Sequence, residues 1–188
     1  MTSTGRAYFD EMYRDVNDPW NFESSLYEQR KYAITVASLP RSRYRSAYEP
    51  GCSIGVLTEL LANRCDRLLS SDIIPAALRR AETRLRGKSH VWIEERSIPV
   101  QWPSGPFDLV VLSEIAYYFD ITDLGLIMTC VMESTMRGAH VVGVHWRGET
   151  NYPLTGDRAH EIIAGTPGLV TVVHHREEEF VLDVWERR

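Results

Sequence analysis

Hydrophobic positions recur along the chain with two different periods, and each period predicts one kind of element. Helical spacing appears at 26–39, 54–64, 75–87, 121–136 and 157–165. Shorter apolar runs at 46–50, 67–74, 90–96 and 139–146 indicate strands, and 169–187 predicts an antiparallel pair joined by a charged turn. The run "FDLVVLSEI" (107–115) is continuous, as expected for a parallel strand buried on both faces.

This alternation of strands and helices predicts the fold class. We expect an α/β protein with a Rossmann-like doubly wound sheet, mostly parallel, with an antiparallel C-terminal hairpin strand and helices on both faces. One domain should span residues 1–188, with residues 1–40 as a helical cap and 44–188 as the core. In such sheets the ligand lies beyond the carboxyl ends of the strands, so the loops after residues 49, 72, 97, 113 and 145 are of interest.

The cap should contain a helix that begins after Ser24 or Ser25. Either serine could cap it, with Glu28 following in the first turn. Aromatic residues are frequent from residue 7 to residue 40, and "DPWNF" before the helix is typical of a turn.

Composition narrows the class of protein. The 188 residues are 44% hydrophobic and 25% charged, which is ordinary for one globular domain. No window reaches the length of apolar residues that a membrane span needs, and a net charge of −5 argues against a nucleic-acid partner. Three scattered cysteines suit neither a disulfide scaffold nor a zinc ribbon, so we expect no metal and a soluble, cytoplasmic protein.

The stretch "YEPGCSIG" (48–55) supports two interpretations. It fits the G-x-S-x-G pattern of a hydrolase, in which Ser53 would be a nucleophile on a strand–turn–helix. Such a serine needs an acid and a histidine later in the chain, and Asp120 or Asp157 with His174 could supply them. Hydrolases of this type place the serine after several strands, whereas only one strand precedes it here, and this disfavours the interpretation.

The alternative is a loop that holds a nucleotide-like cofactor. Asp72 ends "LLSSD", 72 − 55 = 17 residues after Gly55, where a carboxylate can bind ribose hydroxyls through charge-assisted hydrogen bonds. The loop lacks the glycines of a dinucleotide-binding fingerprint, because serine stands at 53 and Val56 follows. A ligand with an amino-acid end suits it better, since Glu49 could bind an ammonium group.

Several segments resemble one family. "YEPGCSIGVLT", "LLSSDIIPAAL" and "FDLVVLSEIAYYF" are similar to the successive motifs of class I S-adenosylmethionine-dependent methyltransferases. "YFDEMY", "DPWNFESSLYEQRKY", "HWRGETNYPLTGDRAHE" and "HHREEEFVLDVWERR" resemble the NodS-type group, the nodulation N-methyltransferases and their relatives. The resemblance spans nearly the whole chain and implies S-adenosylmethionine as cofactor and methyl transfer as the reaction.

The resemblance also implies which residues bind the cofactor. The first motif would hold its methionine part, Asp72 its ribose, and the residues after the second and third strands its adenine. Ser113 and Glu114 would lie beside the sulfonium, and part of the cap would fold over the pocket. The implied residues are Trp20, Tyr27, Arg30, Glu49, Gly51, Cys52, Ser53, Gly55, Asp72, Ile73, Ser97, Ile98, Ser113 and Glu114. Since Ser53 replaces the usual middle glycine, we expect an ordinary backbone angle there.

The acceptor should be a small molecule, most simply an amine. The sulfonium is already activated, so the protein mainly aligns an acceptor lone pair, and a base helps remove a proton. The candidate catalytic residues are Glu114, Tyr117, Tyr118 and His145, with Tyr152 and His160 as members of an acceptor-side lid. The NodS-type resemblance implies N-methylation of an aminosugar or a deacetylated chitooligosaccharide, and an oxygen acceptor remains the alternative.

Two other functions compete with this one. Related methyltransferases of small-RNA ends carry a metal-binding E-x-x-H, but this chain reads Glu114-Ile115-Ala116-Tyr117, without the histidine. A protein that binds the cofactor without catalysis is the second alternative. The sequence does not predict the oligomeric state.

Overall fold

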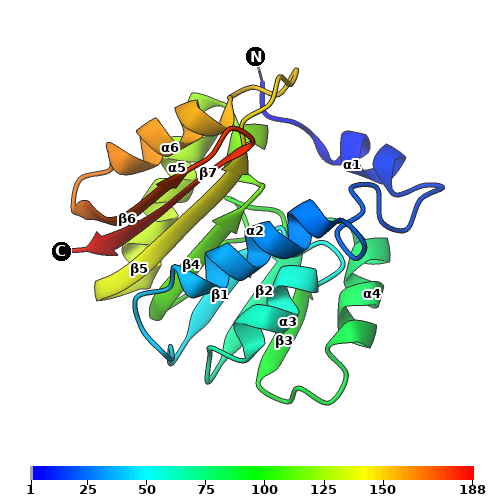
Figure 1. The fold of residues 1–188 in the computed structure, drawn as a ribbon, viewed down its shortest axis with the longest axis horizontal. Coiled ribbons are helices and arrows are strands. Elements are labelled where there is room, and N and C mark those ends of the chain that lie inside the picture. Colours follow the sequence, from blue (N-terminus) through cyan, green and yellow to red (C-terminus); the bar gives the residue numbers. More distant parts are fainter. Residues whose placement is uncertain (1) are drawn as a thin grey trace. The chain divides into compact units, whose positions relative to one another are not determined.

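The structure is a computed structural model that describes residues 2–188. Its elements, all but η1 labelled in Figure 1, are α1 (Arg6–Met12), α2 (Leu26–Ala37), β1 (Ala47–Pro50), α3 (Val56–Ala62), β2 (Leu68–Asp72), α4 (Pro75–Arg84), β3 (Val91–Glu95), β4 (Phe107–Ser113), η1 (Ala116–Tyr118), α5 (Ile121–Ser134), β5 (Thr135–Trp146), α6 (Gly156–Ala164), β6 (Leu169–Arg176) and β7 (Phe180–Arg187). The chain divides into two compact units. The first comprises Gly5–Arg96, and the second Ser97–Arg188 with the N-terminal residues through Thr4.

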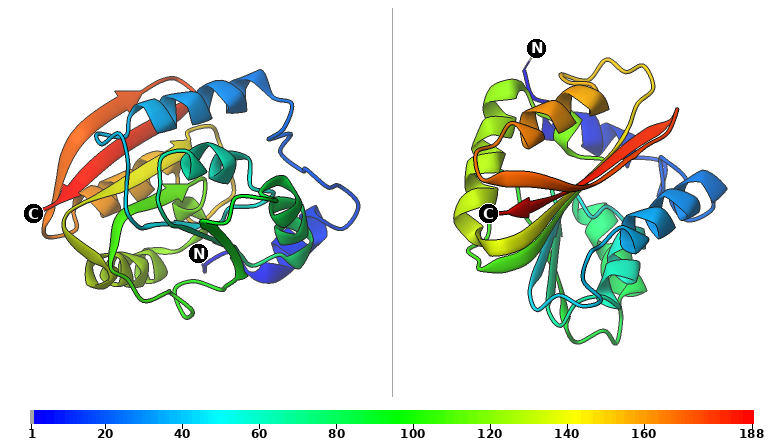
Figure 2. Two further views of the ribbon diagram at one scale, coloured as in Figure 1. Left: turned by 90° about the horizontal axis from the view of Figure 1, so that it is seen from below. Right: turned by 60° about the vertical axis from the view of Figure 1, so that its left-hand side comes forward.

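The first unit is built on three parallel strands in the order β3-β2-β1. α3 and α4 pack on these strands and on each other, and α2 packs on α3 (Figure 2). The helices bury apolar stripes of Leu57 and Leu61 from α3 and of Ala77 and Ala81 from α4. The small alanines let α4 approach the strands closely.

Local sequence signals determine where these helices begin. The Ser25 hydroxyl accepts the Glu28 backbone N–H at 3.3 Å, so the predicted N-cap of α2 is confirmed at Ser25. α4 begins with Pro75 at its first turn, where the missing N–H costs nothing.

The second unit is built on four strands in the order β4-β5-β7-β6. β4 and β5 are parallel, whereas β7 is antiparallel to both β5 and β6, as predicted for the C-terminal pair. α5 and α6 pack on each other and on this part of the sheet (Figure 2). Six consecutive residues of β4, Phe107–Leu112, are buried, which confirms the interpretation of the continuous run.

Some predicted boundaries are wrong. β5 begins at Thr135, not after Gly138, because α5 passes directly into the strand through an extended Thr135 that pairs with Phe107. α4 ends at Arg84, before Gly87. The seven-residue α1 was not predicted as a separate helix.

The division of the chain into a cap and a core stays a prediction. No helix among residues 2–188 is long and apolar enough to cross a membrane.

The tight approach of α3 to α4 yields a stability prediction. Gly55 has φ +80°, and a Cβ there would lie 3.0 Å from the Ala81 Cβ. We expect Gly55→Ala to destabilise the protein by about 1–3 kcal/mol, because it adds left-handed strain and a close contact. Gly125→Ala is the matched control, since Gly125 lies within α5 with open space around it. This second substitution should stabilise by about 0.5–1 kcal/mol. Urea unfolding midpoints measure both, and shifts in the same direction would contradict the prediction.

Candidate functional site

The loop between β1 and α3 reverses the chain with unusual backbone angles. Gly51 has φ +74°, Ser53 φ +50° and Gly55 φ +80°. The expectation of an ordinary angle at Ser53 is therefore wrong, because three left-handed residues are what bring strand and helix together so abruptly. For a non-glycine residue this conformation costs about 1–2 kcal/mol.

Two hydrogen bonds offset the strain at Ser53. Its backbone N–H donates to Asp72 Oδ2 at 2.9 Å, and its hydroxyl lies 2.5 Å from the Tyr13 hydroxyl. The partner of the Ser53 hydroxyl is thus a phenol, whose pKa burial raises further, and not a histidine base. This contact does not support the nucleophile interpretation.

Asp72 links the loop to the end of β2. Besides the Ser53 N–H on Oδ2, its Oδ1 accepts the Ile74 N–H at 3.0 Å. Burial raises the pKa of the Asp72 carboxyl, and these backbone donors oppose that effect. A carboxylate offers about four lone-pair sites, so Asp72 retains capacity to accept hydroxyl groups of a ligand.

Glu49 is a buried carboxyl group in β1, next to β2. The side chains of Thr58 and Ser70 both donate to its Oε2, at 2.7 and 2.8 Å. The residue is 2% exposed, and burial raises its pKa to about 7. Because both hydroxyls use Oε2, Oε1 is the oxygen that could accept a donor from a ligand.

The segment before α2 packs on this loop. Tyr13 and Trp20 form an edge-to-face pair with ring centroids 5.6 Å apart, and both pack with Ile54 and Ile74. The α4 residue Arg84 donates from Nε to the Ile54 carbonyl at 3.1 Å and also pairs with Glu23. The N-terminal aromatic segment is therefore held against the loop by both apolar and charged contacts.

Tyr27, Arg30, Cys52 and Ile73 are the other predicted cofactor residues of the first unit. Tyr27 lies under the Lys31 ammonium at 4.8 Å, whereas Arg30 is exposed on α2. Cys52 is buried, and burial raises the pKa of its thiol, so the thiol stays protonated. Ile73 is half-buried beside the aromatic cluster. Their roles stay predictions.

Ser97, Ile98 and Ser113 belong to the second unit. Ser97 is exposed, and its backbone N–H donates to Gln101 Oε1 at 2.7 Å. Ile98 and Ser113 are half-buried, with Ser113 at the end of β4. Their cofactor roles also stay predictions.

Glu114 follows β4 and adopts a strained conformation with φ +52°. Its Oε2 accepts the Tyr117 hydroxyl at 2.5 Å and the Trp146 backbone N–H at 3.0 Å. Burial raises the pKa of Tyr117 well above its usual value, so this phenol acts as a donor to Glu114 and not as a base. Backbone strain at a carboxylate held in this way is typical of a functional site.

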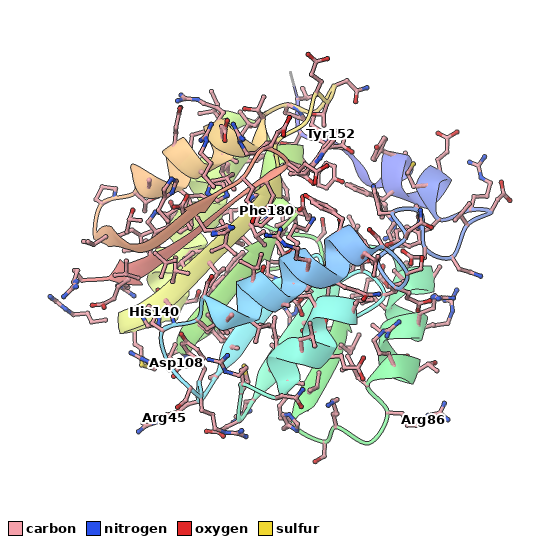
Figure 3. All side chains as sticks on the ribbon, viewed as in Figure 1. Arg45, Arg86, Asp108, His140, Tyr152 and Phe180 are labelled. Atoms are coloured by element: carbon pink, nitrogen blue, oxygen red, sulfur yellow. The ribbon has the colours of Figure 1, made fainter. Side chains whose placement is uncertain are left out.

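Three tyrosine rings surround the same turn. Tyr152 stacks on Tyr117 at 5.1 Å and meets Tyr118 edge-on at 4.6 Å. Tyr152 and Phe180 lie at one end of the second unit, and His140 and Asp108 at the opposite end (Figure 3). The carboxyl end of β5 lies at this turn, because the Trp146 backbone N–H bonds to Glu114 and the His145 ring contacts the Tyr117 ring. Aromatic faces beside a carboxylate favour a cationic or amine-bearing ligand.

His145 is fully buried, and protein groups occupy both of its ring nitrogens. Nε2 accepts the Ala116 backbone N–H at 3.0 Å, and Nδ1 lies 2.9 Å from His160 Nε2. This arrangement does not support a role for His145 as a general base. Within the described residues, no group of histidine, cysteine, aspartate and glutamate is arranged to hold a metal ion.

Five residues of the site were not predicted from the sequence. Tyr13 belongs to the aromatic N-terminal region, which gave a weak signal, whereas the other four carry none. Tyr13, Thr58, Ser70 and Asp183 bond to predicted residues from elsewhere in the chain. The fifth, Arg84, bonds to the carbonyl of Ile54 in the loop.

The family model described as "Nodulation protein S (NodS)" matches residues 7–133. The chain belongs to the NodS family. Among its NodS relatives, Nodulation protein S of Rhizobium tropici is 32% identical over 130 residues, which cover 67% of this chain and 54% of the relative. That of Sinorhizobium fredii NGR234 is 35% identical over 118 residues, covering 61% and 52%. The chain thus spans about half the length of these NodS relatives.

Solved structures support the predicted fold class. A protein from Pseudomonas syringae, described as a candidate methyltransferase, is 38% identical with a TM-score of 0.78, and the match covers 87% of this chain and all of that one. The N-methyltransferase NodS from Bradyrhizobium japonicum WM9, in complex with S-adenosyl-L-homocysteine, is 23% identical with a TM-score of 0.85. That match covers 95% of this chain and 97% of the NodS chain. The α/β methyltransferase fold, mostly parallel with antiparallel C-terminal strands, is confirmed.

The raised pKa of Glu49 predicts a pH-dependent stability. The folded state binds a proton on Glu49 more tightly than the unfolded state, whose glutamate titrates near 4.5. The stabilisation is therefore complete below pH 4.5 and is lost as the pH rises through about 7. The change amounts to about 3 kcal/mol at most. Urea unfolding of wild type and Glu49→Gln at several pH values isolates the effect, because other titrations cancel in the difference. A constant difference between pH 5 and pH 8 would count against the buried, protonatable Glu49.

Proposed function

We propose that this chain is an S-adenosylmethionine-dependent methyltransferase that acts on an amine. The observation that carries the proposal is a pair of carboxyl groups, the buried Glu49 and the half-buried Asp72, on adjacent parallel strands, flanking the left-handed loop 51–55. Loops at the carboxyl ends of such strands bind the ligand in this class of fold. Membership of the NodS family supports the same activity.

The donor set fits a cofactor with an amino-acid end and a ribose. Oε1 of Glu49 suits an ammonium group, and the remaining lone pairs of Asp72 suit two hydroxyls. When bound, S-adenosylmethionine would supply a methyl group on a sulfonium. We assign supporting contacts, as predicted from the family resemblance, to Trp20, Tyr27, Arg30, Gly51, Cys52, Ser53, Gly55, Ile73, Ser97, Ile98 and Ser113.

The chemistry of Glu114 favours nitrogen as the methylated atom. A carboxylate can take the proton from an ammonium group, which frees the amine lone pair to form the new N–C bond. It is far too weak a base to ionise an alcohol. Tyr117, as a donor, would orient the carboxylate, while the Tyr118 and Tyr152 rings would contact the amine.

The acceptor class we propose is an aminosugar, such as the free amine of a deacetylated chitooligosaccharide. The resemblance to nodulation N-methyltransferases suggests this class. NodS from Bradyrhizobium japonicum WM9, whose structure with S-adenosyl-L-homocysteine has a similar fold, is likewise an N-methyltransferase.

Cofactor binding is tested by calorimetric titration with S-adenosylhomocysteine. We expect Asp72→Ala to weaken binding at least tenfold, about 1.4 kcal/mol, because it removes both the ribose acceptor and the anchor of the Ser53 N–H. Asp66→Ala is the matched control, since Asp66 is an exposed aspartate paired with Arg43. Equal loss in both variants, or no binding by wild type at millimolar ligand, would overturn the cofactor assignment.

The acceptor is tested with a matched pair of substrates, glucosamine and N-acetylglucosamine. Methyl transfer should occur only to the free amine, and formation of S-adenosylhomocysteine measures it. Glu114→Gln should lower kcat/KM by about 100-fold through loss of the base. Its S-adenosylhomocysteine affinity should fall far less than its kcat/KM, and the exposed control Glu133→Gln should change neither.

The same experiment separates the alternatives. Equal transfer to both sugars would indicate an oxygen acceptor. Cofactor binding with no transfer to any amine of a wider panel would indicate a binding protein without catalysis.

A further inference from the structure

A chain of hydrogen bonds runs through the interior of the second unit. The Ala116 backbone N–H bonds to His145 Nε2 at 3.0 Å, and His145 Nδ1 lies 2.9 Å from His160 Nε2. His160 Nδ1 lies 2.6 Å from Asp183 Oδ2. The chain thus joins η1, β5, α6 and β7 through three side chains that are 0%, 5% and 6% exposed.

The hydrogen bond from the Ala116 N–H determines which nitrogen of each histidine ring carries the proton. A backbone amide can only donate, so Nε2 of His145 must be the acceptor. A neutral imidazole then carries its proton on Nδ1, which donates to His160 Nε2. His160 in turn must carry its own proton on Nδ1 and donate it to Asp183. Both rings are therefore neutral in the Nδ1–H form.

The surroundings of these rings disfavour a second proton on either of them. Gly143 of β5 leaves room for them, because a Cβ there would lie 3.0 Å from Trp185 and 3.2 Å from His160 Cε1. A second proton on His145 would place a ring N–H against the Ala116 N–H, and a second proton on His160 would do the same against His145 Nδ1. Protonation of either ring would therefore break this series of hydrogen bonds.

A depression in the surface lies at the His160 end of the hydrogen-bond chain. It has a volume of about 360 Å³ and is lined by residues of α6, β6 and β7, most of them charged or polar: Asp157, His160, Glu161, Ala164, Thr171, His174, Arg176, Val181, Asp183 and Trp185. Asp183 also accepts a hydrogen bond from His174 on its other oxygen, at 2.7 Å. Burial acts to raise the pKa of Asp183, but its two histidine partners outweigh this and lower it, so it stays ionised.

The other end of the hydrogen-bond chain is Ala116, in the 114–118 turn that carries the proposed acceptor-side groups. Ala116 begins η1 and lies between the strained Glu114 and Tyr117. The Tyr117 hydroxyl donates a hydrogen bond to the Glu114 carboxylate. The His145 ring also meets the Tyr117 ring edge-on at 5.1 Å. Both the backbone and a ring of this turn are therefore fixed by one imidazole.

We propose that His160 and Asp183 are positioning residues that lock His145 in its Nδ1–H form and so hold the 114–118 turn in place for the acceptor. The inference rests on the proposed function for its consequence in turnover. Its physical core, the locked turn, does not depend on that function.

The locked form is tested first on the wild-type protein. Long-range ¹H–¹⁵N correlation spectra of ¹⁵N-histidine-labelled protein at pH 7.5 report the protonated nitrogen of each ring. We expect His145 and His160 both to be neutral and protonated on Nδ1. An Nε2–H form of His145 would overturn the proposal without any variant, because the Ala116 N–H would then have no acceptor.

Variants of Asp183 test the hold on the turn. Asp183→Leu removes the terminal acceptor, whereas Asp183→Asn keeps an oxygen for His160. Hydrogen exchange of the Ala116 amide should accelerate at least tenfold in the first variant and stay within about threefold of wild type in the second. His174→Gln is the matched control. His174 contacts the same carboxylate, but its side chain is 58% exposed and takes no part in the hydrogen bonds between Ala116 and Asp183.

Turnover tests the consequence for the reaction. Under the proposal kcat/KM for the amine falls in Asp183→Leu, recovers in Asp183→Asn, and S-adenosylhomocysteine affinity is unchanged in both. Wild-type turnover in Asp183→Leu, or unchanged exchange of the Ala116 amide, would overturn the proposal. Absence of turnover in wild type would instead refute the proposed function, while the spectra and the exchange rates still decide the lock.

Discussion

The bond from the Ser53 N–H to the Asp72 carboxylate is the interaction on which the candidate cofactor loop depends. It ties the strained centre of the β1–α3 turn to the end of β2, the neighbouring strand. Gly51 and Gly55 adopt left-handed angles without steric cost, but without a fixed acceptor the same conformation would be costly for Ser53 between them. The carboxylate that maintains the turn is also the one proposed to bind the ribose. A substitution of Asp72 would therefore affect both the conformation of the loop and the proposed binding of the cofactor.

The second unit solves a comparable problem with neutral polar groups. Its interior contains two histidines and an aspartate, which would be unfavourable unless each donor meets an acceptor. They do, in a single direction from Ala116 to Asp183. The charge is confined to the end near the depression, where His174 and the solvent can share it.

The sequence predicts the parts of the molecule that depend on local patterns. The strands and helices follow from periodicity, and Glu49, Ser53 and Asp72 stand out because a strand end, a turn and a spacing are all local features. The left-handed angle at Ser53 was missed, because the bonds that compensate it come from Asp72 and from Tyr13, forty positions away. Asp183 was missed for the same reason: nothing near it in the sequence indicates that it ends a chain begun by Ala116. The β5 boundary depends on pairing with Phe107, which the helical pattern of α5 conceals.

Under the proposed function, a proton and the ammonium group of the cofactor compete for the carboxyl group of the buried Glu49. An ammonium group needs the ionised form, so binding near neutral pH must expel a proton from the protein into the buffer. The heat of binding would then contain the ionisation enthalpy of whichever buffer receives that proton. Occupancy of the site thus has a signature in proton release that is independent of any methyl transfer.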